Sequence, residues 1–238
     1  MTKGSVAQIE SMGLVDGPGI RTVVFMSGCK LRCLFCHNPE MFKLGELNYT
    51  PVELFNKIMR NKPYFQKNGG VTFSGGEPLL QSEFIIEVCQ LLKKENIHIA
   101  LDTAGVGNGN YDEILNLVDL VIFDIKALAD DSYKQITNNN INESLKFLKK
   151  CQKLNKKMWL RQVIVPDIND NETYINELAE FIKSLKNIEK VELLPYHTMA
   201  KDKYNKLDMP YRLKNTVDMN IDRCKKLETL LRNKINIH

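Results

Sequence analysis

Short apolar runs alternate along this chain with longer segments of helical periodicity. The apolar runs, most of them rich in β-branched residues, predict six strands. They lie at residues 20–26, 71–73, 97–101, 120–125, 158–165 and 190–194. Alternation of strand and helix predicts parallel strands joined by right-handed crossovers. We therefore expect a single α/β domain, a partial (β/α)6 barrel similar to a TIM barrel, with an open doubly wound sheet as the alternative.

The segments between these strands carry the apolar residues of amphipathic helices. Thr50, Pro51 and Glu53 have the order of an N-cap, a first-turn proline and a capping-box glutamate. Four further segments place apolar residues at helical spacing. They are Phe84, Ile85, Val88, Leu91 and Leu92; Ile141, Leu145, Leu148 and Cys151; Ile175, Leu178, Ile182 and Leu185; and Val217, Ile221, Cys224, Leu227 and Leu231. We expect the cysteines on helical faces, Cys89, Cys151 and Cys224, to be small core residues.

Composition excludes several classes of protein. A chain of 238 residues with 43% hydrophobic and 26% charged residues is typical of a globular protein. No apolar run approaches the ~18 residues of a membrane span, and no signal-peptide core follows the first residues. We therefore expect a cytoplasmic protein with no membrane partner, whose cysteines do not form disulfides. The net charge of +4 is too small to indicate nucleic-acid binding.

Three cysteines, Cys29, Cys33 and Cys36, fall within eight residues in the spacing C-x3-C-x2-C, with no fourth cysteine nearby. A [4Fe–4S] cluster is usually held by four cysteines, so three would leave one iron open to a small-molecule ligand. The alternative is a structural zinc site completed by His37. Zinc ligands usually come in pairs separated by a longer loop, and His37 adjoins Cys36, so the cluster is favoured.

Polar or reactive residues recur where each predicted strand ends. In (β/α) folds the functional groups lie at the C-terminal ends of the strands. The six groups, in chain order, are Cys29 with Cys33 and Cys36; residues 74–78; Asp102 to Gly105; Asp124 to Lys126; Arg161 to Pro166; and Pro195 to His197. We expect them to surround one mouth of the barrel.

The chemistry of these groups suggests a charged ligand. Gly75 and Gly76 alone would indicate only a tight turn, but directly after a strand they let a ligand approach the backbone closely. Asp102 and Asp124 end neighbouring strands, where they would repel unless a cation lay nearby. The alternative is that each aspartate caps its own helix or loop.

Four further positions have two interpretations each. Lys126 and Arg161 are either surface cations or partners for the carboxylate or ribose of a ligand. His197 is either a rim histidine or a side chain that packs on an adenine. Asp16 begins the turn Asp-Gly-Pro-Gly before the first predicted strand, where it could also grip a peptide backbone.

Five segments of this sequence resemble the radical S-adenosylmethionine enzymes and, among them, the family that activates pyruvate formate-lyase. They are VDGPGIR at residues 15–21, CLFCHN at 33–38, SGGE at 74–77, LDT at 101–103 and ELLPYH at 192–197. The resemblance runs from about Ser5 to the C-terminal helix. It implies one radical S-adenosylmethionine core domain over residues 1–238.

The resemblance also implies roles for individual residues. Cys29, Cys33 and Cys36 would hold a [4Fe–4S] cluster, and S-adenosylmethionine would bind its open iron. The implied contacts to that cofactor are Phe35, Cys36, His37, Gly75, Gly76, Glu77, Asp124, Ile125, Lys126, Arg161 and His197. Positions Asp102, Thr103 and Asp124 match a monovalent-cation site, and Asp16 matches a turn that holds the substrate peptide.

The implied activity is that of an oxidoreductase. A reduced cluster would cleave S-adenosylmethionine, and the resulting 5′-deoxyadenosyl radical would remove a hydrogen atom from a glycine of pyruvate formate-lyase. The cofactors supply this chemistry, and the protein orients them. The resemblance further implies flavodoxin or ferredoxin as the reductant, an anaerobic process and a monomer.

Two departures from the family pattern concern details. Ala104 stands where relatives often carry Asn, and residues 199–213 look shorter than usual, which leaves the partner's identity open. No cysteine lies between Cys36 and Gly75, which disfavours activators with a ferredoxin-like insert. The alternatives are an activator of anaerobic ribonucleotide reductase, a small-molecule radical enzyme such as a deazaguanine synthase, an iron–sulfur electron carrier and a structural zinc protein.

Overall fold

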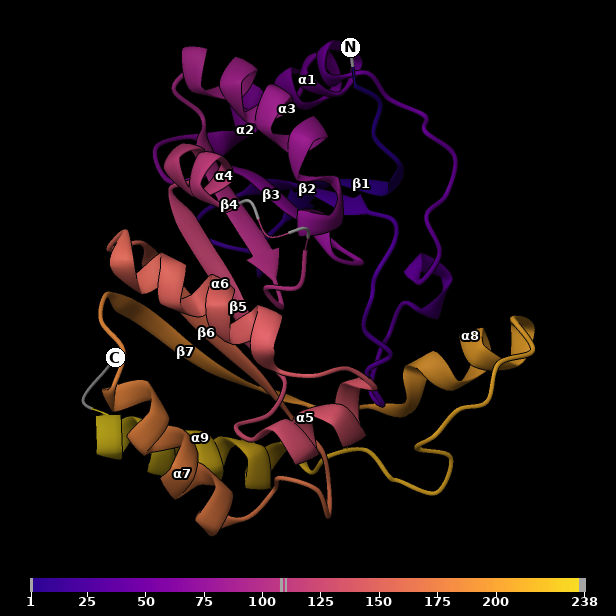
Figure 1. Ribbon diagram of the computed structural model, residues 1–238, viewed down its shortest axis with the longest axis vertical. Helices are drawn as coiled ribbons and strands as arrows, with labels where there is room; N and C mark the ends of the chain where they lie inside the picture. The colour runs from indigo at the N-terminus through magenta and orange to yellow at the C-terminus, as the bar shows by residue number, and fades with distance from the viewer. Residues whose placement is uncertain (1, 108, 110, 236–238) are drawn as a thin grey trace.

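The computed structural model describes residues 2–107, 109 and 111–235, and these form a curved seven-stranded sheet (Figure 1). The strands are β1 (Val6–Gly13), β2 (Arg21–Met26), β3 (Gly70–Gly75), β4 (His98–Thr103), β5 (Leu120–Ile125), β6 (Lys157–Ile164) and β7 (Ile188–Pro195). They lie side by side in chain order, β1 antiparallel to β2 and all later neighbours parallel. A doubly wound sheet would reverse its strand order, so this alternative is wrong and the partial barrel is confirmed.

The six predicted parallel strands are confirmed, with ends that differ by a few residues. Strand β1 was not predicted. Only Val6 and Gly13 are buried in its eight residues, and Ile9 is half-buried. A strand that lies at the sheet edge with most side chains in solvent has no apolar run to reveal it. It is fixed instead by its antiparallel pairing with β2.

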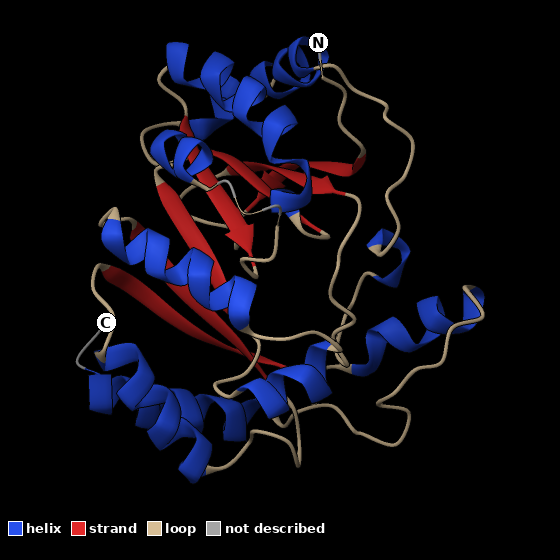
Figure 2. Cartoon of the chain, viewed as in Figure 1, coloured by secondary structure: helices blue, strands red, loops and turns tan. Residues whose placement is uncertain are grey.

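Most helices lie outside the curve of the sheet, and the long connection after β2 crosses the opposite, open side, where α8 contacts it (Figure 2). The helices are α1 (Pro51–Met59), α2 (Lys62–Phe65), α3 (Ser82–Lys94), α4 (Asp112–Leu117), α5 (Asp130–Thr137), α6 (Asn142–Lys153), α7 (Glu172–Lys183), α8 (Lys201–Lys206) and α9 (Ile221–Ile235). Short 3-10 turns are η1 (Pro39–Met41), η2 (Pro78–Gln81) and η3 (Thr198–Ala200). None of the described helices is long and apolar enough to cross a membrane.

The predicted capping box opens α1. The Glu53 amide donates to Thr50 Oγ1 at 3.3 Å, and the Thr50 amide donates to Glu53 Oε2 at 2.8 Å. The predicted faces of α3, α6 and α7 are buried except for Leu91, Leu145 and Leu185, which are partly buried. Cys89, Cys151 and Cys224 are buried as predicted.

The predicted start of the last helix is wrong. The helix begins at Ile221, and Val217 lies outside it with 71% of its surface exposed. The Asn220 side chain accepts a hydrogen bond from the Arg223 amide at 2.9 Å. This cap fixes the start of the helix about one turn after Val217. The apolar spacing therefore begins before the helix does.

One charged side chain is fully buried within the sheet. Arg21 Nε donates to Thr72 Oγ1 at 2.5 Å, and Nη1 donates to the Pro18 carbonyl at 3.0 Å. Nη2 donates to the carbonyls of Val71 and His98. Because buried polar groups are costly without partners, this set of bonds holds the turn at Pro18 against β3 and β4.

We expect Arg21→Met to lower the free energy of unfolding by roughly 2–4 kcal/mol, because several buried carbonyls lose their donor. Urea denaturation of the purified protein measures the change. Arg60→Met is the matched control, since Arg60 is exposed and a surface substitution changes stability by less than about 0.5 kcal/mol. Equal stability of the two variants would contradict the role given to Arg21.

Candidate functional site

A cavity of about 230 Å³ lies at the C-terminal ends of the strands, where most of the predicted site residues meet. The predicted residues that line it are Cys29, Cys33, Phe35, Cys36, His37, Gly75, Gly76, Glu77, Asp102, Thr103, Asp124, Lys126 and Arg161. They come from the connection after β2 and from the ends of β3, β4, β5 and β6. The prediction of one shared mouth is confirmed for the first five groups, whereas no residue of the sixth, Pro195 to His197, lines the cavity.

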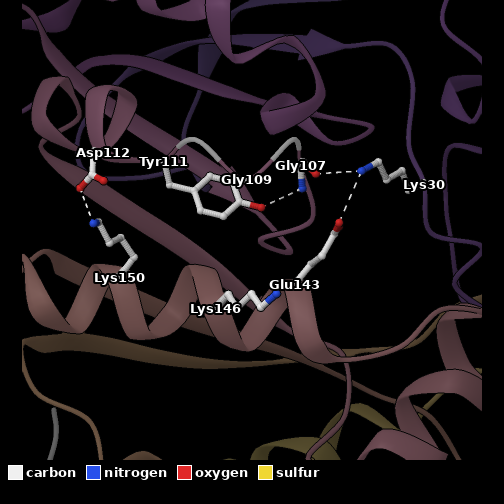
Figure 3. Close-up of a pocket in the computed structure, with 8 residues that line it drawn as sticks. All are labelled: Lys30, Gly107, Gly109, Tyr111, Asp112, Glu143, Lys146 and Lys150. Atoms are coloured by element: carbon white, nitrogen blue, oxygen red, sulfur yellow. Dashed lines mark hydrogen bonds and ion pairs between the residues drawn. The ribbon is translucent and has the colours of Figure 1, made fainter.

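A larger cavity, of about 560 Å³, opens between the connection after β4 and helix α6 (Figure 3). Its described walls include Lys30, Tyr111, Glu143, Lys146 and Lys150, and no cysteine. Size therefore does not identify the reactive site. The smaller cavity is the candidate because it alone of the two brings cysteine thiols together with the strand ends.

Hydrogen bonds of the backbone hold the cysteine loop in place. At its start, the Gly28 amide donates to the Met41 carbonyl at 2.9 Å. Further along, the amides of Arg32 and Leu34 donate at 2.8 and 2.9 Å to the carbonyls of Thr137 and Ile136, at the end of α5. The loop is thus attached to η1 on one side and to α5 on the other.

All three thiols are free and half-buried. Burial raises the pKa of Cys29 to about 12 and that of Cys33 to about 11, while the positive charges of Lys126 and Arg212 oppose the rise at Cys33. Thiols in such surroundings stay protonated at neutral pH until a metal displaces the proton. The donor set therefore fits a metal centre rather than a free nucleophile.

The geometry favours a cluster over a single zinc ion. Within the described ranges, no three His, Cys, Asp or Glu side chains converge on a point that one metal ion could occupy. Zinc needs its ligands at about 2.0–2.3 Å from one centre. The predicted fourth zinc ligand, His37, packs instead on His197, with ring centroids 3.8 Å apart. A four-iron cluster spreads its thiolate ligands over separate irons, which suits cysteines spaced along a loop.

Two glycines at the end of β3 allow the backbone to pack directly on the cysteine loop. Gly75 has φ of +106°, a conformation that favours glycine. A Cβ atom on Gly76 would lie 2.3 Å from the Gly28 carbonyl oxygen. The Glu77 amide donates to that same oxygen at 2.8 Å. A side chain at Gly76 would therefore separate the strand end from the loop that carries the thiols.

Glu77 connects two walls of the cavity. Its buried carboxylate accepts hydrogen bonds from Thr103 Oγ1 at 2.5 Å, the Ala104 amide at 3.0 Å and the Leu79 amide at 3.1 Å. Burial raises the pKa of Glu77 to about 7, and these donors oppose the rise. Its oxygens join the connections after β3 and β4 to each other, and Glu77 also lines the cavity, so its contact with the cofactor stays a prediction.

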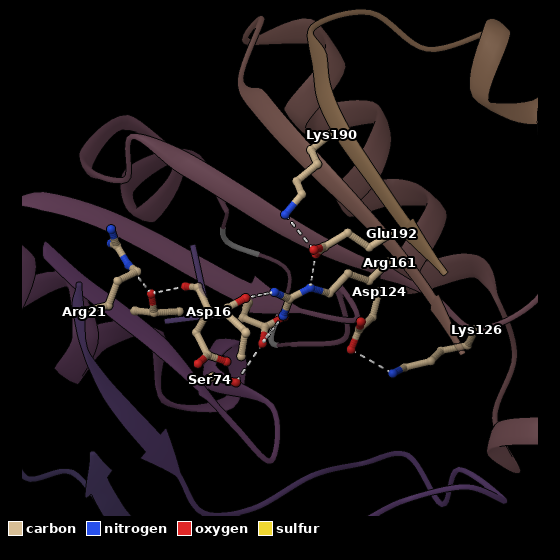
Figure 4. A network of polar contacts seen from close by, with 11 residues as sticks. Asp16, Arg21, Ser74, Asp124, Lys126, Arg161, Lys190 and Glu192 are labelled. Carbon is tan, nitrogen blue, oxygen red and sulfur yellow. Dashed lines mark hydrogen bonds and ion pairs between the residues drawn. The ribbon is translucent and has the colours of Figure 1, made fainter. Parts of the chain in front are cut away.

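Charges of both signs, most of them paired, cross the inner face from β4 to β7 (Figure 4). Arg161 Nη1 lies 3.6 Å from Asp102 Oδ2, and Arg161 Nε donates to Glu192 at 2.9 Å. Lys126 Nζ pairs with Asp124 at 2.8 Å. Burial and the nearby Asp124 raise the pKa of Asp102 to about 7, while its Oδ1 atom is buried with no hydrogen-bond partner in the described structure.

The turn that contains Asp16 reaches this charged face from the other side. Arg161 Nη2 donates to the Val15 carbonyl, and Thr72 Oγ1 donates to the Asp16 carbonyl at 2.5 Å. Burial raises the pKa of Asp16, and the charges of Arg161 and Arg21 oppose the rise. Asp16 does not line the cavity, but the Arg161 network connects its turn to it.

Two predicted cofactor contacts are not at the cavity wall. The side chain of Ile125 belongs to the buried core, because successive residues of a strand point to opposite faces and Asp124 faces the cavity. His197 reaches the site only through His37, and its Nδ1 atom is buried without a partner in the described structure.

Several residues of the site received no individual role from the sequence. Ser74, within the predicted group 74–78, donates to Asp102 at 2.8 Å, and Glu192 pairs with both Arg161 and Lys190. The others are Leu31, Asn38, Phe42, Val163 and Leu194, all of which line the cavity. The available signal for Glu192 was a lone acidic residue within the predicted strand at residues 190–194.

Comparisons with known proteins agree with this geometry. The model of the radical SAM superfamily matches residues 23–182. A pyruvate formate-lyase-activating enzyme of Clostridium pasteurianum is 51% identical over 234 residues, which is 98% of each chain. One of Staphylococcus epidermidis is 41% identical over 225 residues, 90% of each chain.

A solved structure shares the fold. The crystal structure of a radical SAM methyltransferase from Sphaerobacter thermophilus superposes with a TM-score of 0.66 and 18% identity, over 98% of this chain and 75% of that one. Full-length similarity at 51% identity, together with cysteines and glycines that share one cavity, places the chain in a family. It belongs to the radical SAM superfamily and, within it, to the pyruvate formate-lyase-activating enzymes.

Proposed function

We propose that this protein generates a glycyl radical on pyruvate formate-lyase with a [4Fe–4S] cluster and S-adenosylmethionine. One observation carries the proposal: the thiols of Cys29, Cys33 and Cys36 line the same cavity as the glycine backbone and the charged strand ends. When bound, the two cofactors supply the one-electron chemistry that removes a hydrogen atom from glycine. The residues of the chain hold and orient them.

The side chains around the cavity match the parts of S-adenosylmethionine. Gly75 and Gly76 leave the backbone open to close approach by the methionyl part. Lys126 and Arg161 are donors for a carboxylate or a ribose, and each is already oriented by an acidic partner. Asp124 faces the cavity and favours a positively charged ligand.

We also propose a monovalent-cation site at Asp102, Thr103 and Asp124. The unpartnered Oδ1 atom of Asp102 supports it, since a buried carboxylate oxygen normally has a donor or a cation beside it. The Thr103 hydroxyl donates to Glu77 and accepts from the Gly105 amide at 2.8 Å, which leaves one oxygen lone pair for a ligand.

The substrate peptide is proposed to reach the cavity beside the Asp16 turn. Among the described residues, the Asp16 carboxylate accepts no hydrogen bond, which leaves its oxygens available for peptide amides. Strands β1 and β7 do not pair, so the barrel is open to a loop of a large protein. Arg21 and Arg161 fix the backbone of the turn.

The other three cysteines of the chain lie away from the cavity. Cys89, Cys151 and Cys224 are buried apart from the cavity, which leaves three cysteines for one cluster. An external one-electron reductant, flavodoxin or ferredoxin, must then supply the cluster. We further propose a cytoplasmic monomer whose residues 1–238 form one radical SAM domain.

Anaerobic reconstitution with iron and sulfide tests the function directly. The reduced protein is incubated with S-adenosylmethionine and pyruvate formate-lyase, and electron paramagnetic resonance is expected to show a glycyl radical on the lyase. A protein that cleaves S-adenosylmethionine but leaves the lyase without a radical would be assigned to another substrate. Anaerobic ribonucleotide reductase is the substrate to test next, because activation of that enzyme is the alternative function.

We expect Cys33→Ala to lose both the ~4 irons of the cluster and reductive cleavage of S-adenosylmethionine, because one of three thiolate ligands is gone. Iron analysis and product chromatography measure the two losses. Cys89→Ala is the matched control, since Cys89 is buried in α3 away from the cavity. Full iron content and activity in Cys33→Ala would refute the cluster assignment.

Asp16→Asn is expected to lower glycyl radical formation at least about tenfold while cleavage of S-adenosylmethionine without the lyase stays within about twofold. The reason is that the carboxylate would orient the peptide and not the cofactor. Both rates are measured in parallel on the same preparation. An equal fall in the two rates would remove the docking role of Asp16.

Glu77→Gln is expected to change how stability depends on pH. The pKa of Glu77 is raised to about 7 from an ordinary 4.5, so the folded protein binds this proton more tightly than the unfolded chain. The stability of the unsubstituted protein then falls as pH rises from about 4.5 to 7, by up to roughly 3 kcal/mol. We expect the melting temperature of the variant, relative to that of the parent, to be higher at pH 8 than at pH 5. A difference between the two proteins that does not vary with pH would contradict a raised pKa.

A further inference from the structure

The cysteine loop has an outer side as well as a side that faces the cavity. A separate hollow of about 140 Å³ is lined by Arg32, Cys33, Leu34, Phe42, Tyr204, Met209, Pro210 and Arg212. Cys33 therefore lines both this hollow and the cofactor cavity. Of the three cluster cysteines, Cys33 is the one that the hollow reaches. An electron carrier bound in this hollow would be separated from the cluster by little more than the Cys33 side chain.

Two arginines give this hollow a positive rim. Arg32 Nη1 donates to the Cys29 carbonyl at 2.7 Å, and Arg212 donates to the carbonyls of Arg32 and Ile136. Both arginines are exposed residues, and the Arg32 guanidinium also lies over the Phe42 ring, 4.5 Å from its centroid. Among the described residues their hydrogen bonds go to backbone carbonyls and not to carboxylates, so their charges remain available to a partner. The charge of Arg212 also acts on the Cys33 thiol.

The walls of the hollow are apolar and aromatic. Leu34, Met209 and Pro210 are at least partly exposed, while Phe42 and Tyr204 form its buried floor. A concave apolar site suits a flat, protruding apolar group, and the dimethylbenzene edge of a flavin is such a group. A positive rim around this site complements an acidic protein surface.

We propose that the hollow beside Cys33 is the docking site of an acidic flavoprotein, such as flavodoxin, that reduces the cluster. The inference rests on the proposed function, which requires an external reductant. One electron leaves the reduced flavin, which is oxidised by one electron, and enters the cluster, whose charge changes from 2+ to 1+. No bond forms or breaks, and no proton is needed.

The cavity of Figure 3 is the competing basic surface on the other flank of the cysteine loop. Two of its three lysines are already paired, Lys30 with Glu143 at 3.7 Å and Lys150 with Asp112 at 2.6 Å. Lys30 Nζ also donates to the Gly107 carbonyl at 2.8 Å. Since no cluster cysteine lines this cavity, a carrier bound there would lie farther from the thiols.

The test compares two double variants of the reconstituted holoenzyme. Arg32→Gln with Arg212→Gln removes two charges but keeps side-chain amides that can donate to the same carbonyls. Lys146→Gln with Lys150→Gln removes two charges from the competing cavity. Calorimetry measures the Kd of oxidised flavodoxin at ionic strengths of about 0.03 and 0.3 M, and absorbance follows cluster reduction by flavodoxin hydroquinone or by dithionite.

We expect the arginine pair to raise the Kd at least about tenfold at low salt, to flatten its salt dependence and to slow reduction by flavodoxin. Reduction by dithionite should be unchanged, and the lysine pair should stay within about twofold on every measure. An unchanged Kd, a larger effect of the lysine pair, or equal slowing with dithionite would each overturn the proposal. These readouts need neither S-adenosylmethionine nor the lyase, so failure of the proposed function would appear separately, as a reduced cluster that forms no glycyl radical.

Discussion

The close approach between the end of β3 and the cysteine loop is the contact on which the site depends. The Gly28 carbonyl accepts the Glu77 amide, and the space beside it admits no Cβ at Gly76. This contact places the thiols over the strand ends and leaves bare backbone on the cavity wall. Any side chain at Gly76 would move the cluster loop away from the cofactor site, so the glycine is a requirement of assembly and not only of a turn.

The buried charges of the inner face are held in place by one another. Arg161 bonds to Glu192, lies near Asp102 and holds the Val15 carbonyl, so one side chain links β4, β6 and β7 to the Asp16 turn. Charges in low-dielectric surroundings are tolerated when each has a partner. Among the described residues of this network, the Oδ1 atom of Asp102 is the exception, and it supports the cation site proposed there.

The sequence allows the parallel strands, the capping box and most of the cavity lining to be predicted, because each has a local signal in apolar periodicity or in residue type at a strand end. Strand β1 lacked such a signal because it lies exposed at the sheet edge. Glu192 depends on the register of β6 against β7, which pairs it with Arg161 and is a long-range property. Ile125 was carried over by resemblance, although strand alternation beside Asp124 already favours the core for it.

If three cysteines hold a cluster whose fourth iron binds S-adenosylmethionine, that ligand changes the spectrum of the reduced protein. Electron paramagnetic resonance of the anaerobically reconstituted, dithionite-reduced holoprotein is recorded before and after S-adenosylmethionine is added. We expect a [4Fe–4S] signal whose shape and g values change on addition, because the ligand reaches an iron. A cluster signal that is identical with and without S-adenosylmethionine, or the absence of any cluster, would contradict it.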